Sequence, residues 1–303
     1  MAHQVQGLTI FEAPLLKERT SIRLGGPAIA EIRVSSAAGL EQLPETALRV
    51  GGSGVRIEPF GAGTNVLARD QELPLVLITQ DVWQETRVVG QAQDRVLLKA
   101  DAAQKLPALL AKAASLGLGG LEGLTGIPGS VGGAVAMNAG SYGVSIGELA
   151  HSVDVFSPAR GLTEVPARDF VFAYRSCRWI DHEGWFLITG VTLALPKSDG
   201  RLVRERMREV YAKKRASQPV TARSAGCVFK NPAPEHPAGR LLEQAGLKGL
   251  SRGGMYFSTV HANFMVNDGT GNSDDAMYLI ELAKDKVYRE TGHTLETEVR
   301  VWP

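Results

Sequence analysis

The chain has 303 residues, of which 44% are apolar and 21% charged, and these proportions are ordinary for a soluble globular protein of one large domain or two. Its 33 Lys and Arg residues balance 32 Asp and Glu residues, which excludes a global field that would recruit nucleic acid or an anionic membrane. No apolar run is long enough to span a bilayer, and residues 1–20 lack the pattern of a signal peptide. We therefore expect a cytoplasmic protein with no nucleic-acid or membrane partner.

The two cysteines, Cys177 and Cys227, form neither a CxxC pair nor a metal-ligand spacing. We expect reduced thiols and no metal site. For a cytosolic cysteine the ordinary role is a buried structural one. The sequence leaves the oligomeric state open, and a monomer is compatible with it.

Short apolar runs in the first 200 residues predict strands and one clear helix, which indicates a mixed α and β chain. The strands are expected at 55–60, 75–79, 96–100, 152–156 and 186–195. Residues 101–104 have the spacing of a capping box, and the apolar positions that follow recur at helical spacing. This pattern predicts a helix that ends near Gly117, a residue type common just after the last helical turn.

A polar, highly charged tract that begins near residue 196 marks the expected domain boundary and then becomes helical. Because Glu205 and Glu209 interrupt its positive charges, we interpret it as a solvated helix face, with a nucleic-acid patch as the alternative. Two further helices are expected at 238–246 and 273–292. The apolar stripe of the second predicts packing against a sheet.

Residues 117–143 form a glycine-rich run with ten glycines, one acidic residue (Glu122) and no Lys or Arg. Glycine loses more backbone entropy on folding than other residues, so such a run needs a reason, commonly a close approach of main chain to a ligand. A phosphate bound here would be held by backbone dipoles and a helix N-terminus, with Pro128 at the first helical position. The alternative is tight packing of two backbones.

A second glycine motif, GAG at 61–63, follows the predicted strand 55–60. The third glycine of the dinucleotide-binding fingerprint is absent, since Val66 stands in its place, and an ordinary tight turn is the alternative. A P-loop is excluded because no GK[ST] follows any glycine cluster. Two glycine-rich loops, each near a strand end, favour a dinucleotide held mostly by main chain.

Several polar side chains outside these loops are candidates for chemistry. Tyr174 and Arg175 offer a hydroxyl and a cation around a possible strand, although a lone arginine is more often a surface ion-pair partner. Cys227 follows a glycine, Gly226, which we expect to leave the thiol room, and Lys230 and Asn231 supply polar groups nearby.

The last strand candidate, 297–301, alternates between polar and apolar residues, so Glu298 and Arg300 share one face. An exposed strand carboxylate is the plain interpretation of Glu298. His261 could lie near a substrate, with an ordinary structural role as the alternative.

Seven blocks of sequence, in order from residue 20 to near the C-terminus, form a specific combination. They are TSIRLGGPA (20–28), FGAGTNVL (60–67), LEGLTGIPGSVGGAVAMNAGSYG (121–143), FAYRSCRW (172–179), QPVTARSAGCVFKNP (218–232), HANFMVN (261–267) and LETEVRV (295–301). This combination resembles the UDP-N-acetylenolpyruvoylglucosamine reductase (MurB) family. Residues 196–303 are too short for the extra loop of the longer family subtype, so the chain resembles the compact one.

The resemblance implies an α+β fold. A two-lobed FAD-binding domain of the vanillyl-alcohol-oxidase type would precede a smaller α+β substrate-binding domain. We expect an N-terminal segment at 1–19, the FAD-binding domain at 20–196 with its lobes divided near residue 80, and the substrate-binding domain at 197–303.

The resemblance also implies that FAD is bound noncovalently. By matching motifs, the expected cofactor contacts come from the two glycine-rich loops: Gly61, Ala62, Gly63, Thr64, Asn65, Gly126, Ile127, Pro128, Gly129, Ser130, Gly132, Gly133, Asn138 and Gly140. Tyr174, Lys230 and Asn231 are expected to contact the UDP-sugar substrate, the last two at its UDP part.

The implied reaction has two stages, in which NADPH reduces FAD and the enolpyruvyl ether of UDP-N-acetylglucosamine is then reduced to UDP-N-acetylmuramate, a peptidoglycan precursor. By matching motifs, Arg175 and Glu298 stabilise the developing charge and Cys227 donates the proton, at a position where the family often has Ser. A free thiol, with a pKa of about 8.5, is far closer to neutrality than an alcohol.

Two other functions fit parts of the pattern. An FAD-linked oxidase or dehydrogenase of another small substrate would keep the glycine loops without needing the other blocks. A nucleotide-binding regulatory module without turnover would leave Arg175, Cys227 and Glu298 spatially unrelated.

Overall fold

A computed structural model describes residues 2–81 and 85–303. Packing divides the chain into two units, each built from several segments. Unit 1 comprises Met1–Glu12, Ala30–Gly61 and Leu75–Lys213, and unit 2 comprises Ala13–Ile29, Ala62–Pro74 and Lys214–Pro303. The predicted domain borders stay predictions. The packing units differ from them because two short segments, Ala13–Ile29 and Ala62–Pro74, belong to unit 2.

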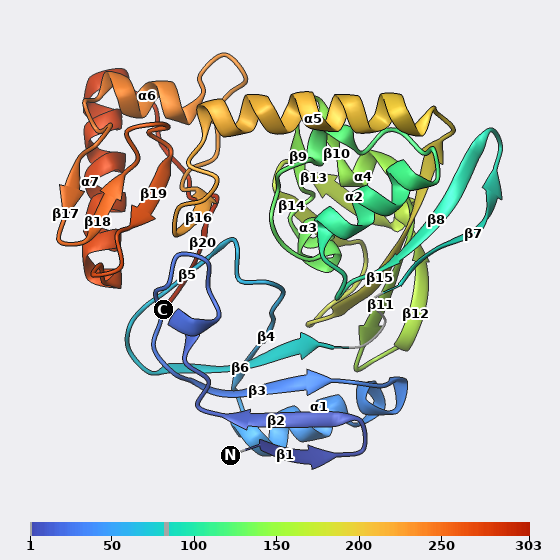
Figure 1. Cartoon of the computed structure of the whole chain (residues 1–303). Coiled ribbons are helices and arrows are strands. Elements are labelled where there is room, and N and C mark those ends of the chain that lie inside the picture. The colour runs from blue at the N-terminus through green and yellow to red at the C-terminus, as the bar shows by residue number, and fades with distance from the viewer. Residues whose placement is uncertain (1, 82–84) are drawn as a thin grey trace. The chain divides into compact units, whose positions relative to one another are not determined.

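The first sheet of unit 1 has the strand order β1-β2-β3-β6-β4. Its strands are β1 (Ala2–Val5), β2 (Leu8–Glu12), β3 (Ala28–Val34), β6 (Leu73–Gln80) and β4 (Arg56–Pro59). The helix α1 (Ala37–Gly51) lies against this sheet (Figure 1), and the Ser36 hydroxyl caps it by accepting the Gly39 N–H at 3.1 Å. The predicted strands at 55–60 and 75–79 are confirmed by β4 and β6.

The second sheet of unit 1 is antiparallel throughout, in the order β12-β11-β15-β8-β7. Its strands are β12 (Gly161–Pro166), β11 (Ala150–Ser157), β15 (Leu187–Pro196), β8 (Arg95–Asp101) and β7 (Thr86–Ala92). The helices α2 (Leu106–Ser115), α3 (Val131–Ala136) and α4 (Ile146–Leu149) pack with it around one apolar core. The predicted strands at 96–100, 152–156 and 186–195 are therefore confirmed.

Unit 1 also contains two small hairpins and two short 3₁₀ turns. The hairpins are β9 (Gly140–Ser141) with β10 (Val144–Ser145), and β13 (Phe170–Ala173) with β14 (Ser176–Trp179). The turns are η2 (Glu122–Leu124) and η3 (Ala167–Asp169), whereas η1 (Leu16–Glu18) belongs to unit 2.

The predicted capping box at 101–104 is wrong, although the helix that follows is confirmed. Asp101 is the last residue of β8, and its Oδ2 accepts the Glu85 N–H at 3.1 Å. Because this carboxylate is bound at the sheet, α2 begins only at Leu106, without a side-chain cap. Gly117 has φ +66, the left-handed conformation expected just after a helix end.

The predicted helix start at Pro128 is also wrong. The helix α3 begins at Val131, and the Ser130 hydroxyl is its N-cap, accepting the Gly133 N–H at 3.2 Å. Pro128 therefore lies in the loop before the helix.

Unit 2 has a four-stranded antiparallel sheet in the order β16-β19-β18-β17. Its strands are β16 (Ser224–Cys227), β19 (Phe264–Asn267), β18 (Met255–Phe257) and β17 (Ser251–Arg252). The helices α6 (Ala238–Gln244) and α7 (Ser273–Thr291) share its apolar core, as Figure 1 shows for α7 beside the sheet. The predicted apolar stripe of α7 is wholly buried, as Ala276, Leu279, Ile280, Ala283 and Val287.

A parallel pair of strands explains why a segment from the first quarter of the chain belongs to unit 2. β5 (Val66–Ala68) pairs with β20 (Arg300–Trp302). The Asn267 amide adds a second tie, because it donates to the Ile22 carbonyl at 3.0 Å.

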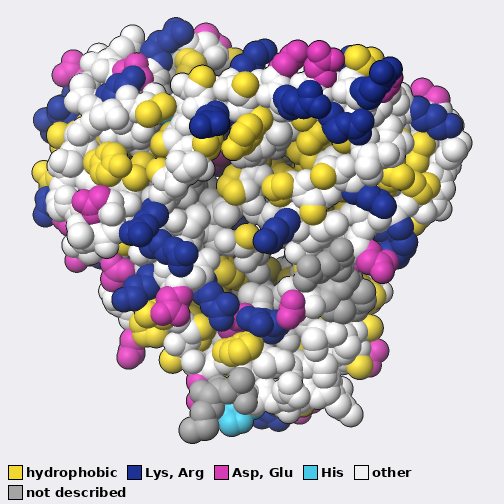
Figure 2. Space-filling view, viewed as in Figure 1, with side chains coloured by type: hydrophobic (Ala, Val, Ile, Leu, Met, Phe, Trp, Pro, Cys, Tyr) yellow, Lys and Arg dark blue, Asp and Glu magenta, His cyan; other side chains and the backbone are white. Residues whose placement is uncertain are grey.

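The charged tract forms the helix α5 (Gly200–Ser217), which runs along the chain from unit 1 into unit 2. Most of its side chains are exposed, and Figure 2 shows Lys and Arg gathered over it with Asp and Glu among them. The interpretation as a solvated helix face is confirmed, with buried Lys214 as an exception. Among the described residues, no helix is long and apolar enough to cross a membrane.

Candidate functional site

The two glycine-rich loops meet within unit 1. A Cβ added at Gly61 would lie 2.7 Å from the Ser130 Oγ, and one added at Gly133 would lie 3.2 Å from the same atom. Gly126 and Gly129 have φ of +83 and +127, conformations that residues with a side chain rarely adopt. The geometry of these loops therefore requires glycine at these positions.

The start of α3 corrects one expectation for phosphate binding. The N–H groups of Val131 and Gly132 donate to the carbonyl oxygens of Gln104 and Ala102, at 2.8 and 3.0 Å. These donors of the first helical turn are consequently not available to a phosphate. What fits FAD in this region is the glycine-lined main chain and the Ser130 hydroxyl, in a run without Lys or Arg.

The remaining predicted cofactor residues divide between the units. Ile127 and Pro128 lie in the loop before α3, and Asn138 and Gly140 follow that helix, in unit 1. Ala62, Gly63, Thr64 and Asn65 belong to unit 2. There the Gly63 carbonyl accepts the Ser21 N–H at 3.0 Å, while the Ser21 hydroxyl donates to the Ser224 carbonyl at 2.7 Å.

Arg175 lies at the tip of the β13–β14 hairpin in unit 1. The register Ala173↔Ser176 leaves a two-residue loop of Tyr174 and Arg175, and Arg175 has φ +56. The Arg175 Cζ lies 5.0 Å from the centroid of the Tyr174 ring, within reach of a cation–π contact. The arginine is half-buried and the tyrosine is exposed, so this tip presents a cation together with a hydroxyl.

Cys227 and Glu298 come together in unit 2 through their main chains. The Glu298 N–H donates to the carbonyl of Val228, the residue after Cys227, at 2.8 Å. The Asn65 side-chain amide donates to the Glu298 carbonyl at 3.1 Å, and the Arg300 N–H donates back to the Asn65 carbonyl at 3.0 Å. Segments far apart in the sequence thus meet where two of the predicted catalytic residues stand.

Gly226 has φ +82, a conformation that residues with a side chain rarely adopt, so the backbone itself favours glycine here. The expectation that it leaves the thiol room stays a prediction. The pairs Ser224↔Val266 and Cys227↔Phe264 show one extra residue in β16. A bulge with a left-handed residue favours glycine, and Gly226 stands at this bulge directly before Cys227.

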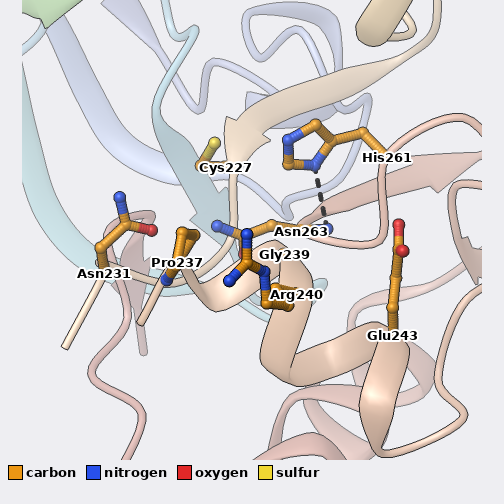
Figure 3. A pocket seen from close by; sticks show the side chains of 8 residues that line it. All are labelled: Cys227, Asn231, Pro237, Gly239, Arg240, Glu243, His261 and Asn263. Atoms are coloured by element: carbon orange, nitrogen blue, oxygen red, sulfur yellow. Dashed lines mark hydrogen bonds between the residues drawn. The ribbon is translucent and has the colours of Figure 1, made fainter. Parts of the chain in front are cut away.

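A pocket of about 400 Å³ opens beside Cys227 within unit 2 (Figure 3). It is lined by Cys227, Asn231, Pro237, Gly239, Arg240, Glu243, His261 and Asn263. Buried Asn263 fixes the pocket wall, because its Oδ1 accepts the Phe229 N–H at 2.9 Å and its Nδ2 donates to the Phe229 carbonyl at 2.8 Å.

His261 presents an uncharged donor to this pocket. The Asn263 N–H donates to Nδ1 of His261 at 3.2 Å, so the proton of the neutral ring sits on Nε2. Burial lowers the pKa of His261, with the nearby Glu243 carboxylate acting in the opposite direction. In Figure 3 the Nε2 edge is turned toward the side of the pocket where Cys227 lies.

The two residues predicted to contact the UDP part differ in their surroundings. Asn231 lines the pocket, and its Oδ1 accepts the Ala238 N–H at the start of α6, at 2.9 Å. Lys230 is ion-paired with exposed Glu296 and is not among the residues that line the pocket.

Sequence reasoning missed Arg240 and Glu243, which α6 brings to Cys227, and Asn263, which holds the wall. No sequence signal marks the first two, because only the packing of α6 places them there. The second cysteine, Cys177, lies in β14 and forms no disulfide, and burial raises the pKa of its thiol to about 12. Among the described residues no group of three His, Cys, Asp or Glu could hold a metal ion.

Two family models match the chain. An FAD binding domain matches residues 36–164, and the C-terminal domain of UDP-N-acetylenolpyruvoylglucosamine reductase matches residues 218–302. The UDP-N-acetylenolpyruvoylglucosamine reductase of Nitratidesulfovibrio vulgaris is 49% identical over 294 residues, covering 97% of this chain and 98% of the relative. The chain belongs to this family.

Other members of the family agree along nearly the whole chain. The reductase of Oleidesulfovibrio alaskensis is 49% identical over 97% of this chain and 98% of its own length. The crystal structure of the Thermus caldophilus enzyme has a TM-score of 0.80 at 32% identity, over 96% of this chain and 98% of that one. The predicted family and the predicted α+β fold, with an FAD-binding domain and a smaller substrate-binding domain, are confirmed. The chain is an FAD-dependent oxidoreductase of this reductase family.

Proposed function

We propose that this enzyme uses NADPH to reduce the enolpyruvyl ether of UDP-N-acetylglucosamine to UDP-N-acetylmuramate, with Arg175, Cys227 and Glu298 acting on the substrate. The family supports the reaction. The observation that carries the assignment of residues is the hydrogen bond from the Glu298 N–H to the Val228 carbonyl. It joins the two segments that hold an acid and a thiol beside a pocket of ligand size.

When bound, FAD would supply hydride transfer between NADPH and the terminal carbon of the enol ether. Negative charge then develops on the adjacent carbon and its carboxylate. Arg175 stabilises this charge as a fixed cation, and Glu298 stabilises it as a hydrogen-bonding acid. Loss of one such preorganised contact commonly costs about 10²–10³ in rate. One hydride and one proton add across the double bond, and NADPH leaves as NADP.

Cys227 donates the proton to the carbon next to the carboxylate. Such general-acid help is commonly worth about 10²–10⁴ in rate. Cys227 is half-buried and lines the pocket, directly after the bulge at Gly226.

The pocket suits the UDP part of the substrate. Arg240 brings a planar, permanently charged group that matches phosphate oxygens, and Asn231 and His261 add uncharged polar groups. We place the enzyme in the cytoplasm, with the UDP-sugar and NADPH as its partners and without a nucleic-acid or membrane partner.

An anaerobic spectrum of the purified protein tests the function. The protein should carry noncovalent FAD whose absorbance NADPH bleaches and the UDP-enolpyruvyl sugar then restores. UDP-N-acetylglucosamine, which lacks the double bond, is the control and should restore nothing. A protein that takes up no FAD, or a reduced flavin that the enolpyruvyl sugar leaves bleached, would contradict the proposal.

A further inference from the structure

The side chain of Asn138 is fully engaged inside unit 1. The residue is only 7% exposed. Its Nδ2 donates to the Ala173 carbonyl at 3.0 Å, and its Oδ1 accepts the Gly147 N–H at 2.9 Å. Ala173 stands two residues before Arg175, so this amide joins the end of the glycine-rich run to the hairpin of the predicted catalytic arginine.

Two glycines of the same segment extend this contact along the hairpin. A Cβ added at Gly147 would lie 2.5–2.7 Å from three atoms of Phe172, so the ring packs where only glycine fits. A Cβ added at Gly140 would lie 3.5 Å from Nη1 of Arg175, which places the guanidinium directly beside this main chain. Segment 138–147 therefore bonds to the hairpin at the Ala173 carbonyl and packs against the Phe172 ring, with the Arg175 guanidinium near Gly140.

The backbone of both partners is unusual. Asn138 has φ +39 and Arg175 has φ +56. Asparagine tolerates the left-handed region because its short side chain can form local hydrogen bonds, whereas arginine enters it less readily. Such conformations persist where the surroundings fix them. At the hairpin tip, the surroundings that the structure provides include the segment 138–147.

We propose that Asn138 is a positioning residue for Arg175. Its amide holds the Ala173 carbonyl and thereby sets where the guanidinium stands, so the segment 138–147 is the seat of the arginine hairpin. This differs from the cofactor contact that the sequence predicts for Asn138 and Gly140. The inference rests on the proposed role of Arg175 in reducing the substrate.

The substitution Asn138→Asp isolates the bond to Ala173. The carboxylate still accepts the Gly147 N–H, but it sets an oxygen against the Ala173 carbonyl where the amide had a donor. We expect reoxidation of the reduced flavin by the UDP-enolpyruvyl sugar to slow by at least about tenfold, the scale of a small misplacement of a catalytic group. Reduction of FAD by NADPH should stay within about twofold, and the FAD content should be unchanged.

Two measurements separate positioning from a general loss of structure. In the Arg175→Ala background, Asn138→Asp should slow reoxidation by less than about twofold, because two residues acting through one group are not additive. The second is iodoacetamide labelling of Cys177, which pairs with Phe172 across the hairpin and is half-buried. Peptide mapping of Asn138→Asp should show labelling at least about fivefold faster as the hairpin loosens.

Asn267→Asp is the matched control. Asn267 is 3% exposed and bonded in the same manner, with Nδ2 on the Ile22 carbonyl and Oδ1 on the Gly269 N–H. Both partners belong to unit 2, whereas the Arg175 hairpin belongs to unit 1. We expect Asn267→Asp to leave both the ratio of the two half-reactions and the labelling of Cys177 unchanged.

The proposal is overturned if Asn138→Asp slows both half-reactions equally, if it slows neither, if it loses FAD while Cys177 stays protected, or if its effect remains in full without Arg175. Arg175→Ala alone distinguishes this failure from that of the proposed function. If Arg175→Ala leaves reoxidation intact, the role of Arg175 is wrong. If it slows reoxidation and Asn138→Asp does not, only the positioning role is wrong.

Discussion

The hairpin that carries Arg175 and the strand pair that carries Cys227 and Glu298 are held in opposite ways. Arg175 stands at the tip of a two-residue loop, and one asparagine amide and two glycine contacts seat its hairpin. Cys227 ends a strand of a four-stranded sheet, and the segment of Glu298 is hydrogen-bonded to the residue that follows it. In the first arrangement a side-chain amide holds one carbonyl of the hairpin, whereas in the second several main-chain and side-chain bonds act in parallel.

In both regions an asparagine side chain donates a hydrogen bond to a main-chain carbonyl, but the two bonds differ in how much depends on them. Asn138 supplies a side-chain bond to the arginine hairpin at Ala173. In unit 2, Asn65 shares the task of holding Glu298 with the bond from the Glu298 N–H to Val228. One substitution should therefore loosen the arginine, while the acid and the thiol should tolerate the loss of one bond.

The largest expected effect is that of Arg175→Ala. Removing the fixed cation should slow reoxidation of the flavin by the substrate by about 10²–10³, with reduction by NADPH nearly unchanged. Arg178→Ala is the control on the same hairpin, because Arg178 is exposed and pairs with Val171 away from the tip. Rapid-mixing absorbance measures both half-reactions. Equal losses in the two variants would mean that the charge of the hairpin matters and the tip does not.

Cys227→Ala should have the next largest effect. Loss of the proton donor should slow substrate reduction by at least about tenfold and leave NADPH oxidation nearly intact. Cys227→Ser should retain activity, since a hydroxyl at this position can also give a proton. Cys177→Ala, at the other cysteine, should leave both half-reactions unchanged. An equal loss in both half-reactions of Cys227→Ala would mean that this thiol is structural.

Asn65→Ala tests the redundancy in unit 2. We expect substrate reduction to slow by only about two- to threefold and the free energy of unfolding to fall by about 1 kcal/mol, the usual value of one hydrogen bond. Stopped-flow kinetics and urea unfolding measure these quantities. A loss as large as that of Asn138→Asp would contradict the comparison, and loss of FAD would support the predicted cofactor contact of Asn65.

The smallest expected effect concerns pH and His261. Burial lowers its pKa below the usual 6.5, against the opposing charge of Glu243 and with the support of Lys248, and Arg240 lines the same pocket. The unfolded chain then binds more protons than the folded one in the window just below pH 6.5, so stability rises with pH through that window and is lost as pH falls. His261→Gln should remove this slope in urea midpoints, whereas exposed His3→Gln should keep it. An unchanged slope in His261→Gln would assign the titration elsewhere.

The sequence predicts much of this architecture because several signals are local. The buried stripe of α7, the glycine loops and the seven blocks all depend on residue types at short spacing. The error at Asp101 has a physical reason, since a carboxylate suited to cap a helix serves equally well to accept the N–H of Glu85, the residue before β7. The two roles cannot be told apart from the sequence, because in both of them the carboxylate accepts a main-chain N–H.

The contact between Asn138 and the hairpin of Arg175 could not be predicted from the sequence, for another reason. Asn138 and Ala173 are 35 residues apart, and nothing in their spacing reveals that a buried amide will join them. The same holds for Arg240, which reaches the pocket of Cys227 only because α6 packs against the sheet of unit 2. Tertiary contacts decided these placements, and local pattern did not.

The central claim is that Arg175, Cys227 and Glu298 serve one step, the reduction of the substrate. Rapid mixing of each alanine variant, first with NADPH and then, once reduced, with the UDP-enolpyruvyl sugar, tests it most directly. The account predicts that flavin reduction stays within about twofold of the unaltered enzyme in all three, while reoxidation slows by at least about tenfold in each. Reoxidation at the unaltered rate in any one of them, or equal losses in both steps, would contradict it.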